Sequence, residues 1–259
     1  MLLPGDERLY RILEKQKKEY TLTICGRDGK DQTYQIGSLI ELIWGIENPA
    51  AIINKIADKN IHIITLTITE GGYNIAKATN EFMLDNENIK YDLAHPQSPK
   101  TTFGFVAEGL RKRKAVGNGP ITILSCDNLQ HNGNTARKAF LSFFQAQDPE
   151  LAEWATVNIT FPNSMVDRIT PSTQPEDIIR LNTQNGTQDG APVYCEDFIQ
   201  WVVEDKFIAG RPAWEKVGVE FTQDVTTYEN MKLSLLNASH TLLSYPCLLY
   251  TSPSPRDRS

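Results

Sequence analysis

The sequence contains no apolar run that approaches the roughly 20 residues needed to cross a bilayer as a helix. Its first residues, MLLPGDERLYRIL, turn polar too early for the apolar region of a secretory signal peptide. An excess of positive charge is also missing, because 26 Lys and Arg stand against 32 Asp and Glu, for a formal net charge of -6. Nucleic-acid phosphates are bound by clustered Lys and Arg. We therefore expect a cytoplasmic protein with neither a nucleic-acid nor a membrane partner.

Cysteine is sparse and scattered. The four cysteines, Cys25, Cys126, Cys195 and Cys247, form no CxxC pair. This spacing argues against a disulfide framework and against a structural zinc site. We expect free, buried thiols.

Metal-dependent and nucleophilic hydrolases have little support in the sequence. Asp127, His131 and Asp167 are residue types that bind divalent metals, but they lack a compact ligand spacing. Ser125-Cys126 lacks the GxSxG turn that exposes a nucleophile. We expect no metal site.

What the sequence does contain is an alternation of β-branched runs with helical patterns over residues 1–220. This alternation predicts an α/β fold, a Rossmann-like and mostly parallel sheet that is incomplete at its N-terminal end. Residues 20–25 and 32–36 flank a GRDG turn, which predicts a hairpin added to that sheet.

The expected elements place polar segments at the ends of strands. We predict helices over 49–58, 102–116 and 134–147, and strands over 62–69, 121–125, 155–161 and 217–221. Each of the first three strands runs directly into a polar segment. Ligands of open α/β sheets bind outside the carboxyl ends of the strands, so we expect the site there.

The pattern changes near residue 221. Residues 228–244 carry apolar side chains at helical spacing, and we expect 221–246 to open a second, all-helical domain. Beyond Tyr245 the composition shifts to PCLLY and then TSPSPRDRS, which cannot continue the helix. We expect residues 247–259 to be a disordered tail that arose in sequence assembly.

Three polar groups could carry chemistry. They are the strand-end pairs Asp127–Asn128 and Asn163–Asp167, and the set Lys232, Asn237 and His240 on the last helix. At about 100° per residue, the last three fall at roughly 0°, 140° and 80°, on one broad side of the helix. Such a side could simply face water, so each group alone is a weak signal.

The same residues stand within long motifs, namely SCDNLQHNG at 125–133, FPNSMVDRITP at 161–171 and YENMKLSLLNASH at 228–240. These motifs resemble the polyol-specific long-chain dehydrogenases, in the superfamily of mannitol dehydrogenases and fructuronate reductases, and the mannitol 2-dehydrogenases above all. TEGGYNI at 69–75 and the segment 196–221 extend the resemblance over nearly all of residues 2–245. Motifs of this length are far more specific than a short glycine signature. The resemblance implies an oxidoreductase that moves a hydride between a sugar alcohol and NAD, giving a 2-ketose such as fructose from mannitol.

The resemblance also implies a role for each matching residue. Lys232 is the expected general acid/base, since burial of a lysine favours the neutral amine that can accept the alcohol proton. Asn128 and Asn237 are expected to donate amide hydrogens to the reacting oxygen. His240 is expected to bind a substrate hydroxyl or to share in proton relay, and Asp167 to bind substrate or brace Lys232.

Glu229 lies one helical turn before Lys232. It resembles an acidic gate of this family on a proton path to solvent. From the sequence alone, a surface ion pair explains it equally well.

The expected cofactor contacts are less complete. The family's glycine-rich phosphate turn precedes the position of residue 1, so we expect an internal start and a missing first βα unit. Asp6 resembles the acidic residue that binds the adenosine ribose and disfavours NADP, although a helix N-cap explains it equally well. Thr69 and Glu70 at one strand end, with Asp127 and Asn128 at the next, are the expected lining of the NAD cleft.

Two other functions stay open. A hexuronate reductase of the same superfamily, acting on fructuronate or tagaturonate, would share Lys232, Asn237 and Asn128 but require a cation for the substrate carboxylate. The other is a catalytically inactive fragment of such an enzyme. For the enzyme itself we expect a monomer that acts on a small-molecule polyol or ketose.

Overall fold

The computed structural model describes residues 6–237 and residue 242. Its first sheet is parallel, with the strands β3 (Ile63–Leu66), β4 (Ile121–Ser125) and β5 (Ile159–Thr160) in that spatial order. All of β4 is buried, as is typical of a parallel strand covered on both faces. The helices nearby are α2 (Pro49–Ala57), α4 (Glu87–Ala94), α5 (Thr102–Ala115), α6 (Asn132–Gln147) and α7 (Pro149–Asn158).

Helices α2 and α5 begin where the sequence predicts, whereas α6 begins at Asn132, two residues before its predicted start. The side chain of Asn48 accepts a hydrogen bond from the N–H of Ala51 at 3.0 Å, with Pro49 at the first helical turn. The Thr101 hydroxyl accepts from the N–H of Gly104 at 3.3 Å and starts α5 in the same way. These caps satisfy backbone donors that the helix itself cannot pair.

The hairpin belongs to a different sheet from the one expected. Strands β1 (Tyr20–Cys25) and β2 (Gln32–Ile36) pair antiparallel as predicted, but β1 then pairs with β7 (Val193–Glu196) and not with the β3–β4–β5 sheet. The buried Asp189 holds this second sheet, because its Oδ2 accepts from the N–H and the hydroxyl of Thr21 at 2.6 and 2.8 Å. Beside it lie the helices α1 (Glu7–Lys15) and α8 (Pro175–Asn185).

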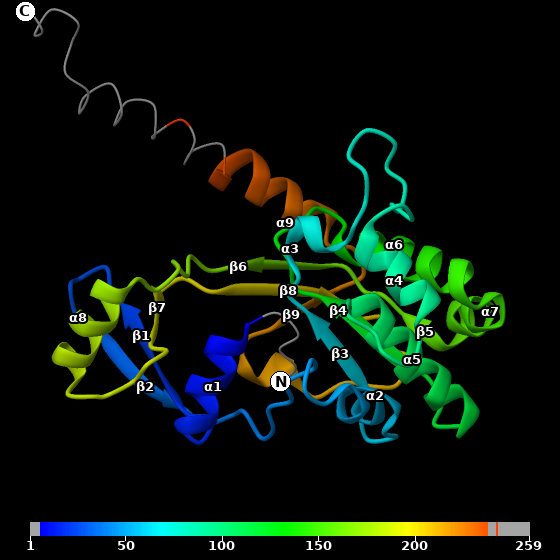
Figure 1. Cartoon of the computed structure of the whole chain (residues 1–259). Coiled ribbons are helices and arrows are strands. Elements are labelled where there is room, and N and C mark those ends of the chain that lie inside the picture. Colours follow the sequence, from blue (N-terminus) through cyan, green and yellow to red (C-terminus); the bar gives the residue numbers. More distant parts are fainter. Residues whose placement is uncertain (1–5, 238–241, 243–259) are drawn as a thin grey trace, which may run out of the picture.

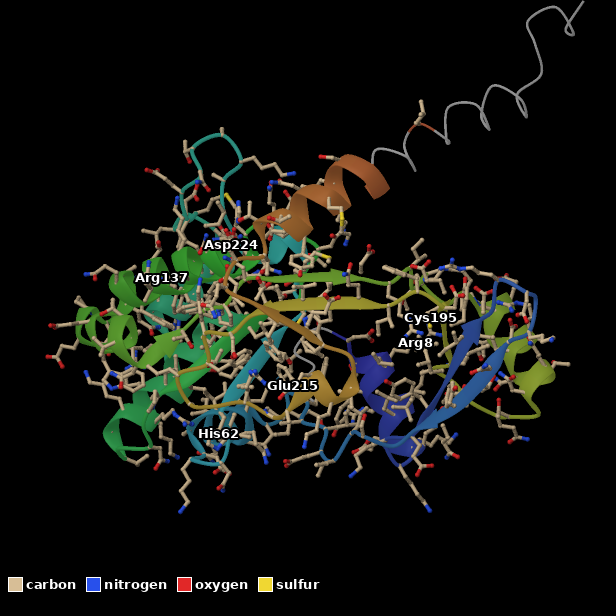
Figure 2. All side chains as sticks on the ribbon, turned by 180° about the vertical axis from the view of Figure 1, so that it is seen from behind. Arg8, His62, Arg137, Cys195, Glu215 and Asp224 are labelled. Carbon is tan, nitrogen blue, oxygen red and sulfur yellow. The ribbon has the colours of Figure 1, made fainter. Side chains whose placement is uncertain are left out.

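The third sheet links the two ends of the molecule. It contains β6 (Ser164–Asp167), β8 (Gln200–Glu204) and β9 (Glu220–Thr222), with β6 antiparallel to β8 and β9 parallel to it. Figure 1 shows the helices α2 and α4–α7 around β3–β4–β5 at one end and α8 with the hairpin at the other. In the view from behind, Cys195 marks the hairpin end and Arg137 of α6 the helical end (Figure 2). Pairing is mostly parallel, with β1–β2 and β6–β8 as the antiparallel pairs, which confirms the α/β prediction.

Three predicted strands are shorter than expected. The one predicted over 62–69 ends at Leu66, because Thr69 has a left-handed φ of 64° and begins the short helix α3 (Thr69–Gly72). The one predicted over 155–161 is largely helical, since α7 continues to Asn158 and leaves two residues for β5. The one predicted over 217–221 starts later, after the 3-10 turn Trp214–Val217.

The last described helix follows β9 directly. Helix α9 (Thr226–Met231) continues as a π-helical segment, Lys232–Asn237. Val225, just before α9, packs with Met165 of β6 and Val202 of β8, so the helix lies against the third sheet (Figure 1). Residues 243–259, including the expected tail, lie outside the described residues, and the domain boundaries at 220 and 246 stay predictions. None of the described helices has the length and apolar character needed to cross a membrane.

Candidate active site

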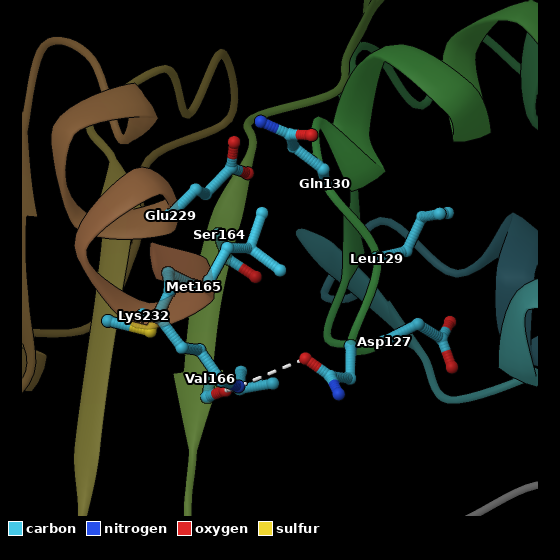
Figure 3. Close-up of a pocket in the computed structure, with 10 residues that line it drawn as sticks. Asp127, Leu129, Gln130, Ser164, Met165, Val166, Glu229 and Lys232 are labelled. Atoms are coloured by element: carbon cyan, nitrogen blue, oxygen red, sulfur yellow. Dashed lines mark hydrogen bonds between the residues drawn. The ribbon is translucent and has the colours of Figure 1, made fainter. Parts of the chain in front are cut away.

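A pocket of about 430 Å³, open solvent included, lies where the end of β4, the strand β6 and helix α9 meet. It is lined by Asp127, Asn128, Leu129, Gln130, Ser164, Met165, Val166, Glu229, Lys232 and Leu233 (Figure 3). This position, at the carboxyl end of a parallel strand, is the one the sequence predicts.

Lys232 is held by three oxygen atoms. Its Nζ donates to the carbonyl oxygen of Val166 at 2.6 Å and to Oδ1 of Asn128 at 3.0 Å (Figure 3). Oδ1 of Asp167 lies 3.5 Å from the same nitrogen, and the two charged side chains are only 11% and 12% exposed. Lys232 therefore does not simply face water, and Asn128, Asp167 and Lys232 come together as the resemblance implies.

This cluster can handle a proton next to an oxygen atom. Asn128 presents its carbonyl oxygen to Lys232, which leaves the hydrogens of its Nδ2 amide to donate to another acceptor in the pocket. The carboxylate of Asp167 lies beside the amine of Lys232 and helps to fix its position in the pocket. The pocket thus presents an amine and an amide donor side by side, the two groups that proton transfer at a ligand oxygen requires.

Hydrogen bonds of Asn132 and close packing at Gly133 fix the loop that carries Asn128. The Nδ2 of Asn132 donates to the carbonyl oxygens of Asp127 and Ser164 at 3.0 and 2.8 Å, and its Oδ1 accepts from the N–H of Ser164 at 2.9 Å. Gly133 packs so closely that a Cβ at this position would lie 2.6 Å from the carbonyl oxygen of Phe161. The end of β4 and the start of β6 are thereby locked together.

Asp127 joins the ends of β3 and β4. Its carboxylate accepts from the N–H of Ile68 at 3.2 Å, the N–H of Thr69 at 2.7 Å and the hydroxyl of Tyr73 at 2.6 Å. Burial, and next the hydrogen bond to Asp127, raise the pKa of Tyr73, so this phenol stays a donor. Sequence reasoning missed Tyr73, whose one signal was its place in the motif TEGGYNI. The carboxylate of Asp127 already accepts three hydrogen bonds from the protein. Its position is therefore explained more directly by support of the cleft wall than by contact with a ligand.

The expected cofactor residues at the chain start and at β3 are exposed. Asp6 caps α1, because its Oδ1 accepts from the N–H of Leu9 at 2.9 Å. Glu70 pairs with Lys77 at 3.2 Å. Around Gly71 a Cβ would meet no atom within 4 Å, so the turn after β3 borders open space that a ligand could enter.

Glu229 is buried, with a side chain only 5% exposed. Its Oε1 accepts from the N–H of His131 at 2.9 Å, and its Oε2 lies 3.3 Å from Nδ1 of the same residue. A surface ion pair, the alternative left open by the sequence, is wrong for this carboxylate. The side chain of Asn237 and the whole of His240 lie outside the described residues.

Cysteine and metal chemistry find no support in the described part of the chain. Burial, and next the charge of Asp127, raise the pKa of the Cys126 thiol to about 12, which keeps it protonated and unreactive. Cys195 is buried while Cys25 and Cys126 are half-buried, and all three are free thiols. Among the described residues, no group of three His, Cys, Asp or Glu side chains is placed to hold a metal ion.

Comparison with known proteins identifies the family of the chain. Residues 7–216 match the family model of the mannitol dehydrogenase Rossmann domain. The chain belongs to the mannitol dehydrogenase family. This match confirms the resemblance and the Rossmann-like fold predicted from the sequence.

Three proteins with known names are similar to the chain. A polyol:NADP oxidoreductase of Gluconobacter oxydans is 45% identical, over 95% of this chain and 52% of the relative. A D-mannonate oxidoreductase of Escherichia coli is 41% identical, over 94% and 50%. The structure of Pseudomonas fluorescens mannitol 2-dehydrogenase in a ternary complex with NAD and D-mannitol matches with a TM-score of 0.88 and 46% identity, over 92% of this chain and 49% of that one. The chain spans about half the length of the curated relatives it matches.

Proposed function

We propose that the natural polypeptide carrying this chain is a nicotinamide-dependent polyol dehydrogenase that oxidises mannitol, or a similar sugar alcohol, to the 2-ketose. The observation that carries this proposal is the cluster of Lys232, Asn128 and Asp167 in a pocket at the carboxyl end of β4. Oxidation of a secondary alcohol requires a base at the hydroxyl and donors for the oxygen as it gains negative charge.

Each residue takes the role that the resemblance implies. Lys232 accepts the hydroxyl proton, and Asn128 donates from its amide to the same oxygen. Asp167 braces Lys232 or binds a further substrate hydroxyl. Asn237 completes the pair of oxygen donors and His240 binds a substrate hydroxyl. Glu229 passes the proton between the buried site and solvent.

The described residues fit a dinucleotide at the adjacent strand ends. Asp127 fixes the start of the turn Thr69–Gly72, and Gly71 borders open space, where the backbone could approach a phosphate or ribose closely. Bound NAD would supply the acceptor for the hydride that leaves the carbinol carbon. Asp6 would favour NAD by repelling the extra phosphate of NADP. The alternative cofactor is NADP, because the relative from Gluconobacter is named for it.

The charges around the pocket favour a neutral polyol over a hexuronate. The relative named D-mannonate oxidoreductase makes a sugar acid the second candidate substrate. A carboxylate substrate needs a cation of its own, and among the described lining residues Lys232 is the one cation, already facing Asp167. The cytoplasmic location and the monomeric state stay predictions.

Steady-state assays of the natural polypeptide decide between these functions. We expect oxidation of mannitol with NAD and reduction of fructose with NADH. Both reactions are measured by the absorbance of the reduced nicotinamide. Faster reduction of fructuronate than of fructose would select the hexuronate reductase. Failure to oxidise any polyol or reduce any hexuronate, with either NAD or NADP, would overturn the proposal.

A further inference from the structure

Two parallel contacts, with a longer hydrogen bond from Nε2 of Gln130 to Oδ1 of Asn230 at 3.4 Å between them, join the loop after β4 to the helix that carries Lys232. Asn128 and His131 lie three residues apart on the loop, and Glu229 and Lys232 lie three residues apart on the helix. Lys232 contacts Asn128 at 3.0 Å, and Glu229 contacts His131 through the backbone at 2.9 Å. The second contact therefore sets the spacing between the two elements one helical turn away from the reacting pair.

In the contact between Glu229 and His131, the carboxylate is buried. Glu229 is 5% exposed, and within the described structure its Oε2 has no hydrogen-bond partner of normal geometry. The imidazole of His131, itself 44% exposed, places Nδ1 at 3.3 Å from that oxygen. A buried carboxylate oxygen is costly without a partner, and the imidazole of His131 is the group that the structure places against this one.

The backbone at His131 is shaped for this contact. Its φ of 51° and ψ of 45° are left-handed, and it directly precedes α6. Among residues with a side chain, His, Asn and Asp tolerate this region best. The conformation turns the N–H of His131 toward Glu229 while the side chain reaches the second oxygen of the same carboxylate.

We propose that His131 is a positioning residue: its N–H donates to Oε1 of Glu229, its imidazole lies against Oε2, and these two contacts hold Asn128 opposite Lys232. It acts through Glu229 and contacts neither Lys232 nor Asn128 in the described structure. The proposal rests on the proposed function, because positioning is measured by alcohol oxidation, but the contact itself can be tested without turnover.

Two substitutions separate the side chain from the backbone. His131→Gly keeps the left-handed backbone and its N–H but removes the imidazole whose Nδ1 lies 3.3 Å from Oε2. His131→Asn also tolerates the left-handed backbone and returns a side-chain donor near the position of Nδ1. For His131→Gly we expect kcat to fall on the order of tenfold to a hundredfold, as misplacement by about 1 Å does. The KM for NAD should hold, because Asp127 fixes the turn after β3, and His131→Asn should recover most of kcat.

Acylation of Lys232, followed by mass spectrometry, tests the contact in the chain itself. Lys232 is 11% exposed, and loosening the second contact should raise its rate of modification severalfold in His131→Gly but not in His131→Asn. The exposed Lys216 is the internal reference and should not change. If His131→Gly fails to fold, Glu229→Gln weakens the same contact from the other side and should expose Lys232 alike.

The outcomes separate the two proposals. No turnover of any polyol or hexuronate by the unaltered polypeptide overturns the proposed function, while the acylation rates still report on the contact. Unchanged acylation of Lys232 in His131→Gly, or unchanged kcat in an active enzyme, overturns the positioning role. Loss of kcat that His131→Asn does not recover overturns it as well, because the role then requires more than a donor at Nδ1.

Discussion

Lys232 and Asn128 meet at 3.0 Å although 104 positions separate them in the chain. The contact brings the helix after β9 onto the loop after β4, and both lie at the carboxyl end of a buried parallel strand. The elements of the first sheet thus carry the proposed oxygen donor, and the helix after β9 carries the proposed base.

Replacement of Asn128 by Ala should lower turnover with little effect on KM for the polyol. The amide acts on the oxygen mainly as negative charge develops, so its loss should cost about 2 to 4 kcal/mol of transition-state stabilisation. Asn60→Ala, in an exposed turn far along the chain, is the control and should behave as the unaltered protein. An equal rise in KM without a fall in kcat would contradict the assigned role.

Tyr73→Phe should destabilise the fold. The phenol is fully buried and donates to Asp127, so its removal leaves a buried carboxylate with one donor fewer, at a cost of about 1 to 3 kcal/mol. Tyr34→Phe removes an exposed phenol that donates to Gln32 and should change stability by far less. Denaturant titration gives the free energy of unfolding of each variant. Equal values for the two variants would show that the hydrogen bond from Tyr73 to Asp127 does not stabilise the fold.

Gly133→Ala should disturb the site through packing. A Cβ there overlaps the carbonyl oxygens of Phe161 and Pro162, which are backbone atoms and cannot rotate away. Overpacking of this kind costs about 1 to 3 kcal/mol and should shift the loop that carries Asn128. Gly71→Ala, where the added Cβ meets open space, is the control for the free energy of unfolding. Equal stability of the two variants would show that the close approach at Gly133 is not required.

The two roles of Asp6 can be separated by substitution. Asp6→Ala should lose the helix cap, at a cost of about 1 kcal/mol, whereas Asp6→Ser keeps a capping oxygen and removes only the charge. If Asp6 faces the adenosine ribose, both changes should lower the preference for NAD over NADP, measured as the ratio of kcat/KM. A preference for NADP in the unaltered enzyme that survives both changes would leave Asp6 as a cap alone.

Local signals in the sequence predict much of the first sheet but not how the sheets join. Asn48 before Pro49 and Thr101 before α5 mark helix starts because capping is decided within a few residues. The partner of β1 depends on a strand far along the chain and on the buried Asp189, which no local pattern announces. The burial of Glu229 and the pairing of Tyr73 with Asp127 are tertiary contacts of the same kind, and the motifs alone could not place them.

The turnover of Lys232→Ala, across pH and beside Lys216→Ala on an exposed surface, tests the proposed chemistry most directly. If Lys232 carries the proton, its loss should lower kcat by on the order of a hundredfold or more and change the pH profile. An added primary amine should restore part of the rate by entering the vacated space, and Lys216→Ala should keep the full rate. Near-normal turnover of Lys232→Ala with an unchanged pH profile would contradict the assignment of the whole site.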